Sequence, residues 1–320
     1  MARVVVTGAA GFVGRALLAR LAAGGESPVA LVRRRAAGRP EPDLVLDLAR
    51  ASLPAGVFDG VSVVFHLAAR TPASRRDGLG SDGWRRVNVE GTRAVAEAAR
   101  AAGARLVHVS SVAVYGTTAN EPVEEGAPLL GSSPYARSKV EGEAVVFDLA
   151  RRGLAAVVVR PSPVYGPGHH GRLSRMLGAV RRGLFPPPAD GAARSHLHVE
   201  NLVDALLLLA RHPSAVGRAF NVADAAPESV RAIFDAAVRT CGVRPLLPAI
   251  PASALRLSAR AGDAAGWLLG RPLPWDSQAL ERLRAPFVIS TRLLESLGWV
   301  PRLGLRDALP ALLGRDGGRA

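Results

Sequence analysis

The chain has 320 residues, 48% hydrophobic and 21% charged, so it can bury a sizeable core and is not a disordered protein. The formal net charge is +14, but the arginines are scattered and the run Arg33–Arg35 has no interleaved aromatic residues, which argues against nucleic-acid binding. The single cysteine, Cys241, excludes a disulfide framework, and no apolar run approaches the ~18 residues of a membrane span.

The chain begins with a dinucleotide-binding pattern. Residues 3–7 form a short β-branched run that predicts a buried parallel strand, and residues 12–21 continue with helical periodicity. Between them, glycines recur at a three-residue spacing. A glycine turn that opens a helix lets backbone N–H groups and the helix dipole hold a pyrophosphate. The expected contacts are Gly8, Gly11, Phe12, Val13 and Gly14.

The second predicted strand, residues 28–32, is directly followed by Arg33. Folds that bind NAD usually place a carboxylate here for the ribose 2′-hydroxyl, whereas an arginine suits a 2′-phosphate. NADP(H) is therefore favoured, although NAD(H) remains possible. Arg33 could also be a solvent-exposed loop residue without a role in cofactor binding. A third strand, residues 43–46, leads to Asp47 and Leu48, which are expected near the adenine.

The fourth predicted strand, residues 61–65, is followed by His66 and then by three small or apolar residues. Leu67, Ala68 and Ala69 would allow a dinucleotide to lie close to the backbone. His66 itself is expected to be a hydrogen-bonded residue at a strand end rather than a catalytic one.

Strands and helices continue to alternate. A polar loop at 71–83 precedes a helix at 84–102 that carries Asn88, and a fifth strand, 105–109, delivers Ser111 at its carboxyl end. A sixth strand is expected at 155–159. This alternation predicts an α/β fold, a Rossmann-type doubly wound parallel sheet that places its ligand at the carboxyl ends of the strands.

Tyr135 and Lys139 begin the helix between the fifth and sixth strands. They are four residues apart, so one face of the helix carries both. Lys139 is the only lysine of the chain. An ammonium near a phenol favours the phenolate, so we expect Lys139 to lower the pKa of Tyr135.

After residue 166 the pattern changes to proline-rich loops and amphipathic helices. We expect a dinucleotide-binding domain at 1–166, to which 198–222 returns with a helix and a last strand. Residues 167–197 and 223–320 would form a smaller, mostly helical substrate-binding region. Within it, 252–269 is better explained as a lid or packing helix than as a surface for a membrane or an apolar substrate. The histidine pairs at 169–170 and 196/198 lack the partners of a metal site, so no metal is expected.

The chain resembles the extended short-chain dehydrogenase/reductase family, the NAD(P)-dependent epimerase/dehydratase group. The matching segments are Thr7-Gly-Ala-Ala-Gly-Phe-Val-Gly14, His66-Leu-Ala-Ala69, Asn88-Val-Glu-Gly-Thr92, Ser110-Ser-Val-Ala-Val-Tyr-Gly116, Tyr135-Ala-Arg-Ser-Lys139, Arg160-Pro161, Val164-Tyr-Gly-Pro167, His198-Val-Glu-Asn201 and Leu297-Gly-Trp-Val-Pro301.

The resemblance implies roles for particular residues. Tyr135 would be the general acid/base, Lys139 would hold the ribose, and Ser111 would hydrogen-bond the reacting oxygen of the substrate. Asn88 would act indirectly, through the hydrogen-bond network of the active site near Lys139. Pro161 would line the cofactor site. The resemblance also implies a homodimer, and a cytoplasmic location is expected.

Departures from the family pattern narrow the reaction. Dehydratases of the family carry an acidic pair where this chain has Val112 and Ala113, so dehydration is not expected. Nucleotide-sugar enzymes commonly have asparagine where this chain has Pro163. Arg194 stands where such enzymes often bind a diphosphate, and a second such arginine could be Arg282 or Arg284.

The first hypothesis is hydride transfer at a secondary alcohol or ketone of a nucleotide-activated sugar, as a 4-epimerase or a keto-sugar reductase. The alternative is an NADPH-dependent reductase or dehydrogenase of a more apolar ketone, steroid-like or polyketide-like. Arg33, Pro163 and the apolar stretch 252–269 favour this alternative. A third hypothesis is a non-catalytic dinucleotide sensor.

Overall fold

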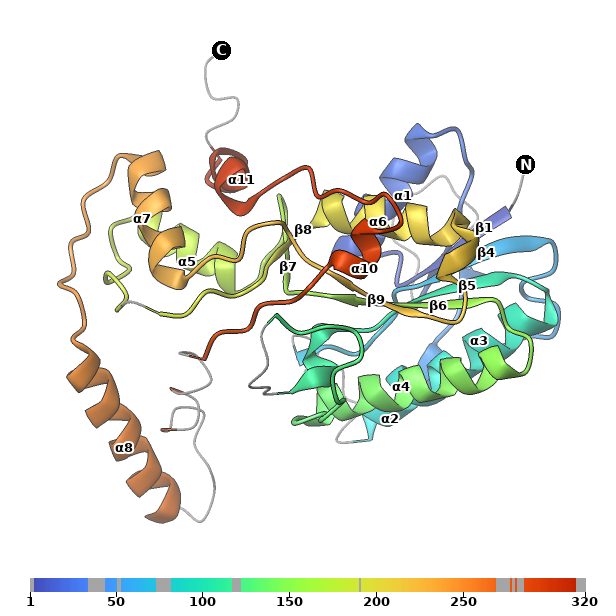
Figure 1. Ribbon diagram of the computed structural model, residues 1–320, viewed down its shortest axis with the longest axis horizontal. Helices are drawn as coiled ribbons and strands as arrows, with labels where there is room; N and C mark the ends of the chain where they lie inside the picture. The colour runs from blue at the N-terminus through green and yellow to red at the C-terminus, as the bar shows by residue number, and fades with distance from the viewer. Residues whose placement is uncertain are drawn as a thin grey trace.

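The structure, a computed structural model, describes residues 3–33, 44–50, 53–72, 82–116, 122–189, 191–268 and 285–314, together with residues 277 and 280. Its centre is a seven-stranded parallel sheet with the strand order β3-β2-β1-β4-β5-β6-β9 (Figure 1). The strands are β1 (Arg3–Thr7), β2 (Val29–Val32), β3 (Leu44–Val45), β4 (Val61–His66), β5 (Arg105–Val109), β6 (Ala156–Pro161) and β9 (Ala219–Val222). The predicted fold class is confirmed.

Helices cover both faces of this sheet. On one face lie α1 (Phe12–Ala23), α6 (Val199–Arg211) and α10 (Arg292–Glu295), and on the other lie α2 (Gly83–Arg85), α3 (Gly91–Ala101) and α4 (Pro134–Arg151) (Figure 1). Successive side chains of β6 enter opposite cores: Val157 packs under α6, and Val158 packs under α3 and α4. Burial on both faces explains why the strands read as unbroken β-branched runs.

The order of the strands places a ligand crevice. β1 lies between β2 and β4, so the chain leaves the sheet in opposite directions after β1 and after β4. Ligands of open α/β sheets bind outside the carboxyl ends of the strands at such a switch point. The glycine turn follows β1, and the small residues 67–69 follow β4.

The helix predicted at 84–102 is present with one difference. Between α2 and α3 the chain forms a π-helical turn, η3 (Arg86–Glu90), which contains Asn88. The Asn88 side chain accepts a hydrogen bond from the backbone N–H of Arg70 at 2.7 Å and donates one to the hydroxyl of Ser138 at 2.9 Å. These contacts across the fold hold a backbone that sequence periodicity alone would make α-helical.

The remaining helices form a second cluster beside the sheet. β7 (Val164–Tyr165) and β8 (Leu197–His198) pair in parallel, and α5 (Arg172–Arg181), α7 (Val230–Cys241) and α11 (Leu305–Leu312) share an apolar core. Helix α8 (Ala252–Leu268) projects from this cluster (Figure 1). The short turns are η1 (Leu48–Arg50), η4 (Val112–Tyr115) and η5 (Pro213–Ala215). No described helix is both long and apolar enough to cross a bilayer.

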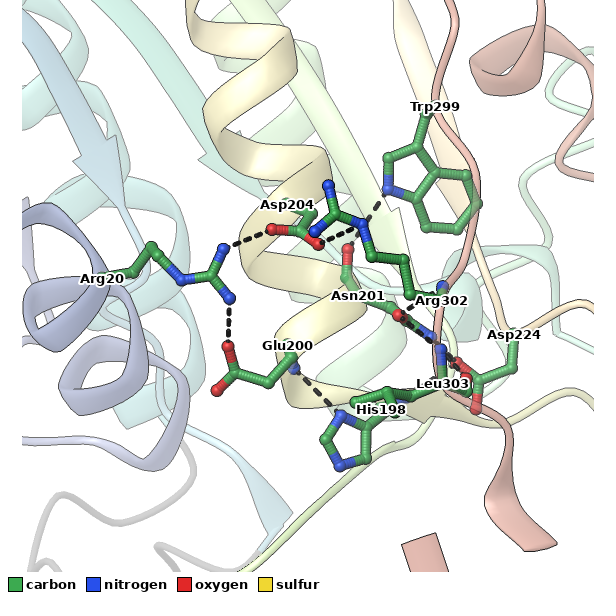
Figure 2. A network of polar contacts seen from close by, with 9 residues as sticks. All are labelled: Arg20, His198, Glu200, Asn201, Asp204, Asp224, Trp299, Arg302 and Leu303. Atoms are coloured by element: carbon green, nitrogen blue, oxygen red, sulfur yellow. Dashed lines mark hydrogen bonds and ion pairs between the residues drawn. The ribbon is translucent and has the colours of Figure 1, made fainter. Parts of the chain in front are cut away.

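The C-terminal part returns to the first sheet. Leu294 and Trp299 pack into the core beneath α1 and α6, although both fall in the range expected for substrate binding. The division into two domains therefore stays a prediction with this overlap. Hydrogen bonds to Asn201 hold the C-terminal segment in place (Figure 2). The carboxamide oxygen of Asn201 accepts from the backbone N–H groups of Arg302 and Leu303, and its NH₂ group donates to Asp224.

Candidate active site

The glycine turn fits a dinucleotide by its shape. Gly8 has φ +67°, and a Cβ at this position would lie 2.7 Å from the backbone nitrogen of Ala68, so a side chain there would be both strained and blocked. A Cβ at Gly14 would collide with the carbonyl oxygen of Gly8. Gly11 is the N-cap of α1 without a side-chain cap. No side chain therefore caps the N-terminus of α1, and its free N–H groups and the helix dipole could hold a pyrophosphate.

A cavity of about 500 Å³ extends from this turn along the carboxyl ends of β4, β5 and β6. Residues from the predicted cofactor site line it: Val13, Leu67, Ala69, Tyr135, Lys139 and Pro161. Ser111 and Arg194 line it as well. None of the described residues that line the cavity is an aspartate or a glutamate.

Tyr135 and Lys139 lie on the first two turns of α4, and the residues at its N-terminus favour the start of a helix there. Pro134 occupies its first turn, and the Ser133 hydroxyl accepts a hydrogen bond from the backbone N–H of Ala136 at 3.1 Å. The Lys139 side chain is buried, and its ammonium donates to the carbonyl oxygen of Val109, the last residue of β5, at 2.8 Å. This bond ties the helix to the strand that delivers Ser111.

Ser111 has two local contacts. Its hydroxyl oxygen accepts from the backbone N–H of Ala113 at 3.2 Å and so caps the 3₁₀ turn η4. The hydroxyl also forms a hydrogen bond with the Tyr135 phenol. The structure thus brings Ser111, Tyr135 and Lys139 to one wall of the cavity.

The electrostatics differ from the expectation in one respect. Burial raises the pKa of Tyr135, and the hydrogen bond with Ser111 opposes that rise. Burial lowers the pKa of Lys139 to about 8, opposed by the Glu143 carboxylate one turn later. The expected lowering of the Tyr135 pKa by Lys139 is not found, because the ammonium is directed at the Val109 carbonyl and desolvation of the phenol dominates.

The other predicted cofactor residues lie around the turn. Arg33 is exposed and directly follows β2. The Asp47 carboxylate accepts from the backbone N–H of Ala49 and caps η1, while Leu48 is buried against Gly91. Phe12 packs against the ring of His169, with 4.7 Å between centroids. Arg34 and Arg35 lie outside the described residues, as do Arg282 and Arg284.

Three predicted residues are engaged within the protein. The bonds of Asn88 with Arg70 and Ser138 make it a support for the backbone at Tyr135, because the Ser138 hydroxyl donates to the Tyr135 carbonyl. His66 is buried and hydrogen-bonded through both ring nitrogens, to Thr7 at 2.7 Å and to Thr92 at 3.0 Å. This agrees with its expected role at a strand end.

Arg194 is the third of these residues. Its guanidinium donates to the carbonyl oxygen of Ala285 at 2.7 Å and lies 5.6 Å from the centroid of the Phe287 ring. Arg194 therefore reaches the cavity while holding the segment that carries Ala285 and Phe287, both of which line it.

Sequence reasoning missed a buried ion pair behind the site. Arg160, at the end of β6, donates to both carboxylate oxygens of Glu143 on α4 and to the hydroxyl of Tyr115. The side chains of Arg160 and Glu143 are only 4% and 1% exposed. The available signal was the i, i+4 spacing of Lys139 and Glu143, which places a carboxylate on the face of α4 that carries the lysine.

Trp84 was also missed. Its ring meets the Tyr135 ring edge-on at 5.8 Å between centroids, and the Arg70 guanidinium lies 4.8 Å from the Trp84 ring. Trp84 therefore contacts the phenol ring from the side of α2. We expect it to orient Tyr135.

Replacing Trp84 with alanine should lower kcat about tenfold, since a small displacement of a reacting group costs rate out of proportion to its size. Dinucleotide affinity should change less than about twofold, and Trp84→Phe should keep most of the activity because it preserves an edge-on aromatic contact. Steady-state kinetics and equilibrium binding on both variants check this. Equal losses in kcat and in dinucleotide affinity would mean that Trp84 only supports the fold.

Comparisons with known proteins agree with this geometry. The model of the NAD dependent epimerase/dehydratase family matches residues 4–223. A 4-hydroxy-2-methyl-3-oxo-4-farnesyl-3,4-dihydroquinoline-1-oxide ketoreductase from Stigmatella aurantiaca is 32% identical over 82% of this chain and 80% of its own length. A UDP-glucose 4-epimerase from Mycolicibacterium smegmatis is 31% identical over 96% of both chains. The solved structure of MoeE5 in complex with UDP-glucose and NAD has 27% identity and a TM-score of 0.73, covering 98% of this chain and 97% of that one.

Proposed function

We propose that this chain, which belongs to the NAD-dependent epimerase/dehydratase family of extended short-chain dehydrogenases, is a reductase of a ketone carried by an apolar molecule. Its relatives in the family include a ketoreductase and a UDP-glucose 4-epimerase. NADPH is the proposed reductant. The observation that carries the proposal is the chemistry of the cavity wall beyond Ser111 and Tyr135.

That wall is mostly apolar. Its apolar members are Val112, Ala113, Pro163, Val164, Leu202, Ala285, Pro286 and Phe287, and the other lining side chains beyond Ser111 and Tyr135 include the hydroxyls of Thr71, Ser132, Ser133 and Ser162. A nucleotide-activated sugar presents hydroxyls and a diphosphate, which need donors and cations, whereas this wall offers methyl, ring and proline surfaces. Arg194, the cation nearest to that role, donates to the Ala285 carbonyl and lies against the Phe287 ring, which leaves fewer of its N–H groups for a diphosphate. These contacts support the apolar ketone, which we therefore propose ahead of the nucleotide sugar that the sequence put first.

Tyr135 would be the proton donor in the reduction. When bound, the dinucleotide supplies a hydride to the carbonyl carbon. The carbonyl oxygen needs a proton as the hydride arrives. The raised pKa of Tyr135 keeps its phenol protonated at neutral pH, so it can donate that proton. Ser111 would hydrogen-bond the same oxygen and stabilise the charge that develops on it. The products are a secondary alcohol, the oxidised cofactor and the Tyr135 phenolate, which regains its proton from water before the next turnover.

Lys139 and the glycine turn would bind the cofactor. The compact ammonium of Lys139 can donate to a ribose hydroxyl while it retains its bond to the Val109 carbonyl, because it carries three N–H groups. Gly8, Gly11 and Gly14 would hold the pyrophosphate at the N-terminus of α1.

Replacing Arg33 with alanine should raise the Kd for NADPH about tenfold, because the loss of a charge-assisted contact to a 2′-phosphate is uncompensated at this exposed position. The Kd for NADH should change less than about twofold. Arg100→Ala is the matched control, since Arg100 is an exposed arginine in the last turn of α3 and is not a predicted cofactor residue. Equal effects of Arg33→Ala on both cofactors would contradict an NADP preference.

A second candidate is 4-epimerisation of a nucleotide sugar. It is supported by the 96% coverage of the UDP-glucose 4-epimerase relative and by the MoeE5 complex with UDP-glucose and NAD. An epimerase returns the hydride to the other face of the same sugar and so keeps its cofactor, whereas a reductase exchanges it in every turnover. A homodimer in the cytoplasm remains part of the proposal, and light scattering on the purified protein tests the dimer.

A further inference from the structure

One edge of the molecule exposes apolar side chains. Ten large apolar side chains are exposed among the described residues. Five of them lie in three places: just after α5, in the loop that follows α7, and on α8. They are Leu184, Leu246, Leu247, Ile250 and Leu257, which we call the leucine edge. Leu246 and Leu257 are 73% and 71% exposed. Clustered exposed apolar residues mark an interaction surface, whereas scattered ones need no explanation.

The edge is continuous at its α5 end. The backbone N–H of Leu246 donates to the carbonyl oxygen of Gly183 at 3.0 Å, so the loop after α7 lies against the residue that precedes Leu184. At the other end, α8 projects from the body (Figure 1), and most of its described side chains are exposed, which favours a surface over the packing helix that the sequence favoured. It turns Leu255 and Ala259 inward and leaves Leu257 outward.

The same edge is basic. Residues 239–265 contain Arg239, Arg244, Arg256 and Arg260 against one carboxylate, and all four arginines are exposed. That carboxylate, Asp263, accepts hydrogen bonds from the backbone and the hydroxyl of Ser277. Exposed leucines among arginines are the combination that binds anionic lipid: the apolar side chains enter the acyl boundary and the guanidinium groups pair with headgroup phosphates.

The segment also leads to the proposed site. Beyond α8 the chain reaches Ala285, Pro286 and Phe287, which line the cavity beside Arg194. An enzyme for an apolar ketone needs a route by which a poorly soluble substrate reaches the cavity. Contact of the leucine edge with a bilayer would bring the enzyme to such a substrate.

We infer that the leucine edge docks on the surface of a bilayer that contains anionic lipid, and that the ketone is drawn from this bilayer. The source of the ketone rests on the proposed function, whereas the docking does not. This is peripheral attachment without a membrane-spanning helix. The occupant is a lipid surface because the charge and the exposed leucines on this edge complement it together.

Vesicle flotation of the full-length protein tests the docking without substrate or cofactor. The protein should float with vesicles of phosphatidylcholine containing about one third phosphatidylglycerol, and not with phosphatidylcholine alone, in about 0.1 M salt. Leu246→Ser/Leu257→Ser and Arg256→Glu/Arg260→Glu should each weaken binding at least about tenfold. Controls with the same changes elsewhere, Val300→Ser/Leu303→Ser and Arg3→Glu/Arg218→Glu, should bind like the parent.

Turnover of a short, water-soluble ketone should stay unchanged in the two edge variants, which shows that they are folded. Flotation that is equal with and without phosphatidylglycerol, or equal in edge and control variants, would overturn the inference. So would a parent that binds no vesicle while Leu246→Ser/Leu257→Ser changes its mass in light scattering, since the edge would then join two copies of the chain. Failure to reduce any ketone would sink the proposed function but leave the flotation result intact.

Discussion

Replacing Tyr135 with phenylalanine is expected to lower turnover at least about 10²-fold, because the carbonyl oxygen then loses its proton donor at the moment of hydride transfer. The ring itself is kept, and with it the edge-on contact with Trp84. Dinucleotide affinity should therefore stay within about threefold of the parent. Single-turnover kinetics and equilibrium binding measure the two quantities separately.

Tyr165→Phe is the matched control. Tyr165 is a buried tyrosine whose hydroxyl donates to Asp224 at 2.7 Å, and it does not line the cavity. Its loss should reduce stability more than turnover. A Tyr135→Phe protein with unchanged turnover would remove the catalytic assignment and favour a non-catalytic dinucleotide sensor.

Replacing Arg160 with methionine is expected to destabilise the fold by about 3–5 kcal/mol, because it leaves the buried Glu143 carboxylate without its bidentate partner. The hydroxyl of Tyr115 and the carbonyl of Glu125 would also lose a donor. Urea unfolding of the full-length protein measures the change in the free energy of unfolding.

Two further variants sharpen this test. Arg160→Met combined with Glu143→Gln should cost less than Arg160→Met alone, since no charge is then left buried without a partner. Arg151→Met removes the exposed pair with Asp148, in which the arginine is 71% exposed, and should cost less than about 1 kcal/mol. A loss for Arg160→Met as small as that for Arg151→Met would show that the buried pair contributes no more than a surface one.

Local sequence patterns predicted most of the strands of the sheet. They also predicted the starts of α1, which follows the glycine turn, and of α4, which carries Tyr135 and Lys139. The β-branched runs of β1, β4, β5 and β6 are buried on both faces, so their composition alone carries the signal. The same holds for Tyr135 and Lys139, whose relation depends only on helical spacing. Where a structure follows from neighbours within one or two turns, the sequence was sufficient.

Contacts between distant segments were not predictable in this way. The π-helical turn at Asn88 depends on Arg70 and Ser138, which lie 18 and 50 residues away in sequence. The direction of the Tyr135 pKa shift depends on burial, which periodicity does not measure. The engagement of Arg194 with Ala285 and Phe287 likewise arises from a segment about 90 residues later, and it changed the order of the two substrate hypotheses.

The most direct test of the proposed function is the stoichiometry of cofactor and product. Purified protein is incubated with NADPH and an apolar ketone, and separately with UDP-glucose and no added cofactor. The proposal predicts one NADPH oxidised for each alcohol formed from the ketone, and no conversion of UDP-glucose to UDP-galactose. Interconversion of the two sugars without added dinucleotide, together with NAD released in near-stoichiometric amount on denaturation, would contradict it and identify an epimerase.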